Sequence, residues 1–231
     1  MDDVAVLSEL ILSSSGSPPP ISNPAFLRLF LYCAKGNVTK AAERHTHYWS
    51  VRTELLGEST TFNEPSISAL LSTNPFIATP SNARDTSGRR LIYVRPRFLD
   101  WSVFSLPTAL SCVWFTINNL LLFDPVAAEH GVVIISNMAG LSLSNVSRAF
   151  FRDVARSVYG AMPLRVSAIR GVNNPPIFQY IFAFMKMFLP VKIRGRLEVI
   201  GGDHGRLLEV LPPASIPEVL GGRLEVAGDD I

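Results

Sequence analysis

The feature that most constrains this chain is a stretch without acidic residues that also contains its most apolar segment. Between Val154 and Leu197 there is no Asp or Glu, and there are seven Lys or Arg residues. Within it, Ile177–Leu189 reads IFQYIFAFMKMFL, where only Gln179 and Lys186 are strongly polar. A helix that is apolar on every face has to be buried, inserted in lipid, or placed over something apolar. Because flanking positive charge attracts anionic surfaces, the pattern suggests a protein that handles a lipid at a membrane.

The composition suits one compact domain with a smaller appendage, and 231 residues can bury a sizeable core. Only 17% of the residues are charged, which predicts much buried surface or a lined internal cavity. The net charge of +2 argues against a general polyanion binder. The basic residues alternate with apolar residues of the buried type, so no nucleic-acid partner is expected. Cys33 and Cys112 lie far apart and are expected to be reduced core residues, which favours a cytoplasmic protein.

No targeting or membrane-spanning segment is expected. The N-terminus, MDDVAVLSELIL, has acids where a secretory signal needs positive charge. No apolar run reaches the roughly 18 uninterrupted residues that a transmembrane helix needs.

The N-terminal third predicts helices. The pattern favours a short helix over residues 2–12, then a flexible linker in the Ser/Gly/Pro-rich residues 13–24. Helical spacing of apolar residues continues from Ala25 to Leu56, with a stop at Gly36-Asn37. The Ser/Thr/Asn/Pro-rich stretch Ser59–Pro80 is expected to be a connector.

Beyond it, strand and helix patterns alternate. The expected strands are Leu91–Val94, Gly131–Ile135, Arg165–Val172 and Leu197–Ile200, and the expected helices are Leu106–Phe123, Leu143–Tyr159 and Pro175–Pro190. Such alternation predicts an α/β fold, a mainly parallel sheet flanked by helices, here preceded by a small all-helical module. The expected units are residues 1–24 (N-terminal segment and linker), 25–75 (helical module), 76–225 (α/β domain) and 226–231 (tail).

Two long segments resemble a known family. Met162–Gly201, MPLRVSAIRGVNNPPIFQYIFAFMKMFLPVKIRGRLEVIG, and Leu207–Gly222, LLEVLPPASIPEVLGG, are similar to the CRAL-TRIO lipid-binding domain. Asp85-x-x-Gly88-Arg89 and the ISNMAG run at 135–140 extend the similarity, which covers about residues 25–222. The resemblance implies a lipid cavity in residues 76–225 under a mobile gate helix, Asn174–Arg196. Gly171 and Gly195 would be its hinges.

The sequence departs from the family pattern at three places. FLYCAKGN at residues 30–37 stands where a basic run is frequent, Asn137 stands where Asp is usual, and Ser167 replaces a second basic residue of the tocopherol branch. The resemblance therefore implies lipid binding more directly than phosphoinositide binding.

Three groups of residues are candidates for a lipid site, each with a plainer alternative. The gate helix, or an ordinary core helix, would present Ile177, Phe178, Ile181, Phe182, Met185, Phe188 and Leu189. The lipid cavity, or plain core, would be lined by Val113, Trp114, Ile117, Leu121, Ile134, Val154 and Val158.

The third group is basic: Arg165, Lys192, Arg194 and Arg196. By resemblance to the tocopherol and retinaldehyde branches, Arg165, Lys192 and Arg196 would grip an inositol-phosphate head at the edge of the gate. Lys192 and Arg196 are four residues apart, so on a helix they would share a face. The alternative is a solvated positive face without a specific ligand.

Catalytic patterns are weak. There is no G-x-S-x-G, no P-loop and no strand-linked G-x-G-x-x-G. His45 and His47 are two residues apart and would point to different sides of a helix, which disfavours a metal pair. We expect neither metal nor cofactor.

The leading hypothesis is therefore a non-enzymatic, monomeric protein that binds one hydrophobic lipid in an internal cavity and transfers or presents it at membranes. It would be cytoplasmic and peripherally attached to membranes, endosomal ones among them. Phosphoinositide membranes would assist the exchange. The alternatives are a phosphoinositide-binding membrane adaptor without transfer activity, and a small α/β esterase.

Overall fold

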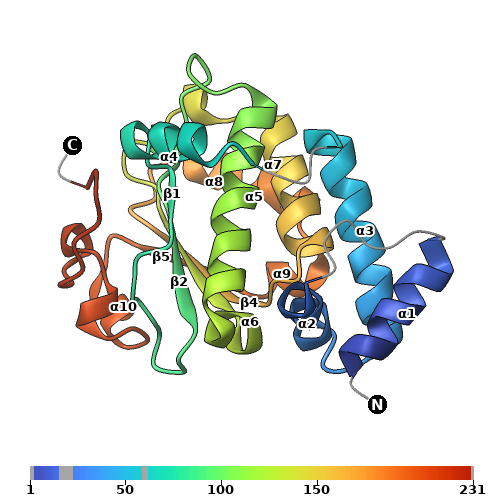
Figure 1. Ribbon diagram of the computed structural model, residues 1–231. Coiled ribbons are helices and arrows are strands. Elements are labelled where there is room, and N and C mark those ends of the chain that lie inside the picture. Colours follow the sequence, from blue (N-terminus) through green and yellow to red (C-terminus); the bar gives the residue numbers. More distant parts are fainter. Residues whose placement is uncertain (1–2, 16–22, 59–61, 230–231) are drawn as a thin grey trace.

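The computed structural model describes residues 3–15, 23–58 and 62–229 (Figure 1). Most of the linker expected over residues 13–24 lies outside the described residues. The α-helices are α1 (Asp3–Ser15), α2 (Pro24–Cys33), α3 (Val38–Leu56), α4 (Glu64–Thr73), α5 (Leu106–Phe123), α6 (Pro125–His130), α7 (Arg148–Val154), α8 (Phe178–Phe188), α9 (Val191–Arg194) and α10 (Gly205–Leu208). The strands are β1 (Ile77–Ala78), β2 (Arg90–Val94), β3 (Val132–Asn137), β4 (Val166–Val172) and β5 (Leu197–Gly201). A π-helix, η3 (Ala155–Ala161), continues α7, and four short 3₁₀ turns are η1 (Pro96–Phe98), η2 (Leu143–Asn145), η4 (Pro213–Ser215) and η5 (Glu218–Leu220).

The sheet has the order β1-β2-β3-β4-β5. Strands β2 to β5 are parallel, and the two-residue strand β1 pairs antiparallel with β2 at one edge. Every residue of β3 is buried, as expected for an apolar strand in a parallel sheet covered on both faces. The α/β fold with a mainly parallel sheet is confirmed.

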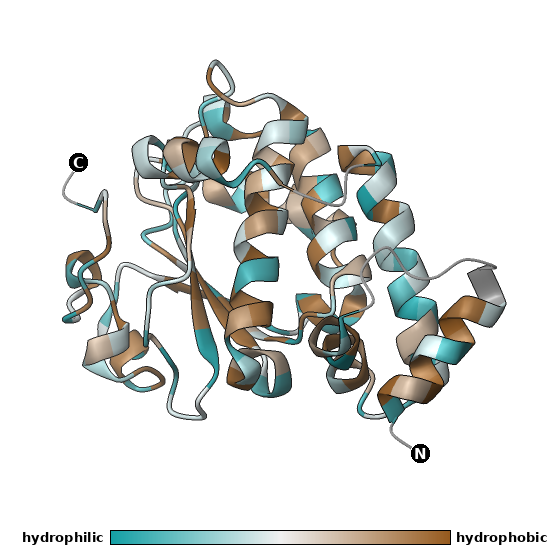
Figure 2. Ribbon diagram, viewed as in Figure 1, coloured by the Kyte–Doolittle hydropathy of each residue, from teal (hydrophilic) through white to brown (hydrophobic). Residues whose placement is uncertain are grey.

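Alternating side chains divide the core between the two faces of the sheet. Ile92 and Ile134 belong to the large apolar cluster under α5, whereas Leu91 and Ile135 belong to a second cluster under α10 and the C-terminal segment. Figure 1 shows the sheet between these two layers. Apolar residues of the strands and of the inward helix faces meet at the centre (Figure 2).

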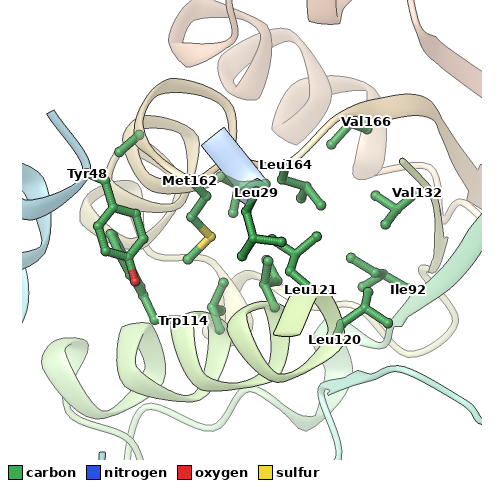
Figure 3. Close-up of a cluster of buried hydrophobic side chains, with 14 of the residues drawn as sticks. Leu29, Tyr48, Ile92, Trp114, Leu120, Leu121, Val132, Met162, Leu164 and Val166 are labelled. Carbon is green, nitrogen blue, oxygen red and sulfur yellow. The ribbon is translucent and has the colours of Figure 1, made fainter. Parts of the chain in front are cut away.

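The N-terminal helices share the core of the α/β domain. Val4, Leu7 and Ile11 of α1 belong to the same apolar cluster as residues of α2, α3, α5 and the sheet. Tyr48 of α3 and Trp114 of α5 have ring centroids 5.0 Å apart (Figure 3).

Two expected boundaries are wrong. Ser59–Pro80 contains α4 and β1, because Asn63 accepts a hydrogen bond from the Ser66 amide and Ile67 is buried, so that its polar residues cap a helix. The expected helix Leu143–Tyr159 is interrupted, because Ser147 caps a new helix, α7, after η2. Both errors come from interpreting capping residues as loop or helix interior.

Among the described helices, α5 is long and apolar enough to cross a membrane by length and composition. However, 56% of it is buried inside the molecule, where it packs between the sheet and α3, α4 and α7. This is the packing of a core helix.

His45 makes the stability of the helical module depend on pH. It is 2% exposed among the rings of Phe26 and Phe30, and its Nε2 accepts a hydrogen bond from Trp49 Nε1 at 3.0 Å. Burial lowers the pKa of His45 to about 4, whereas an unfolded histidine has a pKa of about 6.5. Between these values the unfolded chain binds a proton that the folded chain does not, so stability falls as pH falls.

We therefore expect His45 to remove about 2 to 3 kcal/mol of unfolding free energy between pH 7 and pH 4. Urea unfolding across this range should be less pH-dependent for His45→Gln than for the wild type, and His130→Gln, at an exposed position, should keep the wild-type dependence. Parallel curves for His45→Gln and the wild type would contradict this assignment.

Candidate functional site

A cavity of about 150 Å³ lies between the sheet and the helices α5, α7 and η3. Its wall contains no Asp, Glu, Lys, Arg or His. The lining residues come from every strand of the sheet, from α5, α7, α8 and η3, and from the loops between them. They are Phe76, Ile77, Ile92, Val94, Pro96, Leu99, Val113, Ile117, Ile134, Ser136, Met138, Asn145, Phe150, Phe151, Val154, Ala155, Val158, Tyr159, Ile169, Met185, Leu189 and Leu197.

Of the seven residues expected to line a cavity, five lie in this wall: Val113, Ile117, Ile134, Val154 and Val158. Trp114 and Leu121 do not. They are seven residues apart on α5 and form a different stripe of the helix, which faces α2 and α3 (Figure 3). Trp114 Nε1 donates to Ser157 Oγ at 2.9 Å, so its polar atom is already bonded in the core.

Most of the wall was not predicted from the sequence, including β2, η1 and all of the π-helix lining except Val158. Ile92 and Val94 of β2 could have been found, because alternation places them on the face that Ile134 also occupies. Tyr159 gave no such signal, since its position depends on the change from α-helix to π-helix at Ala155.

Helix α8 closes one side of the cavity. Met185 of α8 and Leu189, which follows it, reach the wall, whereas Phe178 and Ile181 pack against Met138 and Leu141 in a separate apolar cluster. The other expected gate residues lie nearby: Ile177 and Phe182 adjoin that separate cluster, and Phe188 packs against the main core.

The outer side of this segment exposes large apolar side chains beside Gln179 and Lys186. Tyr180 is 69% exposed, Met187 64% and Val191 80%. The expected gate Asn174–Arg196 is two helices, because α8 ends before Pro190 and α9 starts after it.

Side-chain contacts fasten α8 to the body of the domain. The guanidinium of Arg148, on α7, lies 5.3 Å from the ring centroid of Phe184. Arg194 Nε donates to the carbonyl of Leu189 at 2.8 Å, just beyond the C-terminal end of α8. Arg148 therefore links α8 to α7 through a cation–π contact, whereas Arg194, on α9, links α8 only to the next helix of the same segment.

Amide side chains hold the segment before α8. Asn173 Nδ2 donates to Asn137 Oδ1 at 3.0 Å, Asn137 Nδ2 donates to the Tyr93 hydroxyl at 3.0 Å, and His204 Nε2 lies 2.7 Å from Asn173 Oδ1. Asn137 is thus part of a hydrogen-bonded row across the ends of β2, β3 and β4.

The expected hinge glycines differ in their surroundings. A Cβ at Gly171 would lie 3.0 Å from Asn174 Oδ1, so a larger residue there would require the Asn174 side chain to shift. Gly195 has open space around it. A hinge role for either glycine stays a prediction.

Three of the four expected basic residues donate to backbone carbonyls. Arg194 and Arg196 donate to backbone carbonyls, of Leu189 and Val166 respectively, and so hold the chain around α9. Arg165 Nη1 donates to the carbonyl of Glu129 at 2.6 Å, and Lys192 is exposed. The expected shared helix face of Lys192 and Arg196 is wrong, because α9 ends at Arg194 and Arg196 turns back to β4.

Arg44 joins Arg165 and Lys192, and sequence analysis missed it. Its Nε and Nη2 donate to the carbonyl of Met162 at 3.0 and 2.8 Å. Burial raises the pKa of the Cys33 thiol, and the charges of Arg44, Arg165 and Lys192 oppose that rise, which places all three around Cys33. We call these three the basic cluster; among the described residues none of them forms an ion pair with Asp or Glu.

The part of the chain that the structure describes holds no group of three or more His, Cys, Asp or Glu side chains suited to a metal ion. Both cysteines are free, with Cys112 buried and Cys33 half-buried.

Comparison with known proteins agrees with this geometry. The model of the CRAL/TRIO domain matches residues 77–222. The chain belongs to the CRAL/TRIO domain family. The resemblance found in the sequence is thereby confirmed, and the match contains the whole cavity wall except Phe76.

Relatives and a solved structure extend the comparison. The chain is 26% identical over 224 residues to "Alpha-tocopherol transfer protein-like" of Homo sapiens and of Mus musculus, which covers 95% of this chain and 64% of each relative. It is 27% identical over 92 residues to "Phosphatidylinositol/phosphatidylcholine transfer protein SFH11" of Arabidopsis thaliana, covering 38% of this chain and 24% of that protein. The crystal structure of Sfh5 shares the fold with a TM-score of 0.56 at 11% identity, covering 91% of this chain and 84% of that one. This chain thus spans less than two thirds of the length of the tocopherol-type relatives.

The contact between Arg148 and Phe184 can be tested through the mobility of α8. An exposed cation–π pair contributes about 0.5 to 1 kcal/mol, so Arg148→Ala should increase amide hydrogen exchange in residues 177–190 by about two- to fivefold. Lys186→Ala is the matched control, because Lys186 lies 4.2 Å from the ring centroid of Phe182 within α8 itself and fastens nothing to the body. Equal exchange in the two variants, measured by mass spectrometry, would show that Arg148 does not restrain the helix.

Proposed function

We propose that this protein is a lipid carrier, which holds one hydrophobic lipid in the cavity and transfers or presents it at membranes. The observation that carries the proposal is an apolar, charge-free cavity closed by a helix that also exposes large apolar side chains on its outer side. The tocopherol-type and phosphatidylinositol/phosphatidylcholine transfer relatives support it. No step of this function requires catalysis.

The size of the cavity implies that α8 moves. A cavity of about 150 Å³ matches an engineered protein cavity that holds benzene, which is far smaller than a lipid. Displacing Met185 and Leu189 would enlarge the cavity and open it on the side of α8.

The energetics favour opening at a membrane. Moving fourteen methylene groups from lipid into water costs on the order of 10 kcal/mol, so the lipid tail must pass directly from the bilayer into the cavity without entering water. The exposed side chains of Tyr180, Met187 and Val191 would face the bilayer during that passage.

The basic cluster would guide this docking. A cation near an anionic bilayer contributes about 1 kcal/mol, and arginine and lysine suit phosphate oxygens. We assign the phosphoinositide contact to Arg44, Arg165 and Lys192, because these three charges lie around Cys33 and none of them is paired with Asp or Glu among the described residues. The protein would act as a monomer on cytoplasmic membrane surfaces such as those of endosomes.

A transfer assay tests the carrier function. The full chain would be incubated with donor liposomes containing radiolabelled lipids of several classes and with unlabelled acceptors, and lipid extracted from the purified protein would be analysed by mass spectrometry. We expect transfer of at least one class and a co-purifying lipid. Neither transfer nor bound lipid of any class would refute the proposal.

The membrane contact has its own test. Lys192→Glu should weaken binding to phosphoinositide-containing vesicles by about tenfold at low salt, and the difference from the wild type should shrink as salt screens the charges. Arg223→Glu, the same charge change on the opposite layer of the domain, is the control. Vesicle co-sedimentation that is unchanged in Lys192→Glu would show that the basic cluster is not the contact.

The adaptor alternative rests on the separation of the basic cluster from the cavity wall, to which none of its residues contributes. Vesicle binding that depends on Lys192, together with no transfer of any lipid, would favour the adaptor.

A further inference from the structure

Two hydroxyl groups in the cavity wall have no hydrogen-bond partner among the described residues. The wall contains three polar side chains, those of Ser136, Asn145 and Tyr159. Asn145 is fully engaged: its Nδ2 donates to the carbonyls of Arg97 and Leu99 at 3.2 and 3.3 Å, and its Oδ1 accepts from the amide and the hydroxyl of Ser142. The hydroxyls of Ser136 and Tyr159 are left for a ligand.

Ser136 points into the cavity because of its place in β3. Ile134, Ser136 and Met138 alternate along the chain, and all three line the wall, so they share one face of the sheet. Ser136 is 7% exposed, whereas buried hydroxyl groups normally have partners.

Tyr159 reaches the wall from the π-helix. Ala155, Val158 and Tyr159 all line the cavity, and π-helical turns are rare and are frequently found at functional sites. Burial raises the pKa of Tyr159, so its hydroxyl keeps its proton and can donate a hydrogen bond.

The same wall contains no charged group that would stabilise a charged ligand. Burying a phosphate or carboxylate without a cation or a set of donors is far more costly than burying a hydrogen-bonded hydroxyl. No Lys, Arg or His lines the wall, so the wall offers no cation to pair with such a charge.

We propose that the cavity selects uncharged lipids that carry a hydroxyl or carbonyl oxygen, and that Ser136 and Tyr159 bind this oxygen. Anionic lipids are excluded from the cavity and meet the protein at the basic cluster. This selectivity rests on the carrier function and specifies the chemical class of its cargo.

Matched fluorescent probes test the selectivity. A pyrene-labelled twelve-carbon alcohol, the carboxylic acid of the same chain, a phosphatidylcholine bearing that acyl chain, and the pyrene alkane would each be titrated into the full chain at pH 8. We expect the alcohol to bind at least about tenfold more tightly than the acid and the phosphatidylcholine, because one or two hydrogen bonds are gained and no charge is buried.

Variants identify the residues. Ser136→Ala combined with Tyr159→Phe should weaken alcohol binding about tenfold and leave alkane binding unchanged. Tyr159→Phe alone, which removes a single oxygen, should give a smaller loss of the same kind. Ser50→Ala with Tyr32→Phe, at exposed positions of α3 and α2, is the matched control.

Two results would overturn the proposal: acid or phosphatidylcholine binding as tight as alcohol binding, or undiminished alcohol binding by folded variants with a wild-type unfolding midpoint. Absence of binding by all four probes would overturn the carrier function itself and this selectivity with it.

Discussion

The packing of α8 against the cavity is the contact on which the rest of this structure depends. Met185 and Leu189 complete a wall that has no charged residue, while Phe178 and Ile181 pack against Met138 and Leu141. The contact buries apolar surface without filling the space beneath it, so closure is favourable while room for a ligand remains. Arg148 of α7 contacts the ring of Phe184 on α8, and Arg194 of α9 donates to the carbonyl of Leu189 at the end of α8.

The positive charge of the acid-free stretch is used in several different ways. Arg156 pairs with Glu54 at 2.6 Å and Arg170 with Glu198 at 2.8 Å, so the excess is reduced by acids from outside the stretch. Arg194 and Arg196 hold backbone carbonyls. Arg165 also donates to a backbone carbonyl, that of Glu129, whereas Lys186 and Lys192 are exposed. Arg44 lies with Arg165 and Lys192 around Cys33. A surface formed in this way can attract an anionic membrane while the cavity stays uncharged.

Local patterns predicted the elements well wherever packing agreed with them. Helix α5 has the expected bounds, Leu106–Phe123, because Ser105 caps it and the apolar run ends at Asp124. The cavity was half predictable: Val113 and Ile117 follow from the helix period, but Trp114 and Leu121 were placed on the wrong side of the same helix. The sequence shows that α5 has several apolar stripes and does not show which one faces a void.

The sequence by itself determined that the chain forms a mainly parallel α/β sheet, that Ile177–Leu189 covers something apolar, and which family it belongs to, because these depend on short-range periodicity and contiguous motifs. Only the tertiary structure decided that Arg44 lies with Arg165 and Lys192, and that Ser136 and Tyr159 open into one cavity. Those groups are brought together from distant parts of the chain by sheet pairing and helix packing. No local pattern encodes their distances.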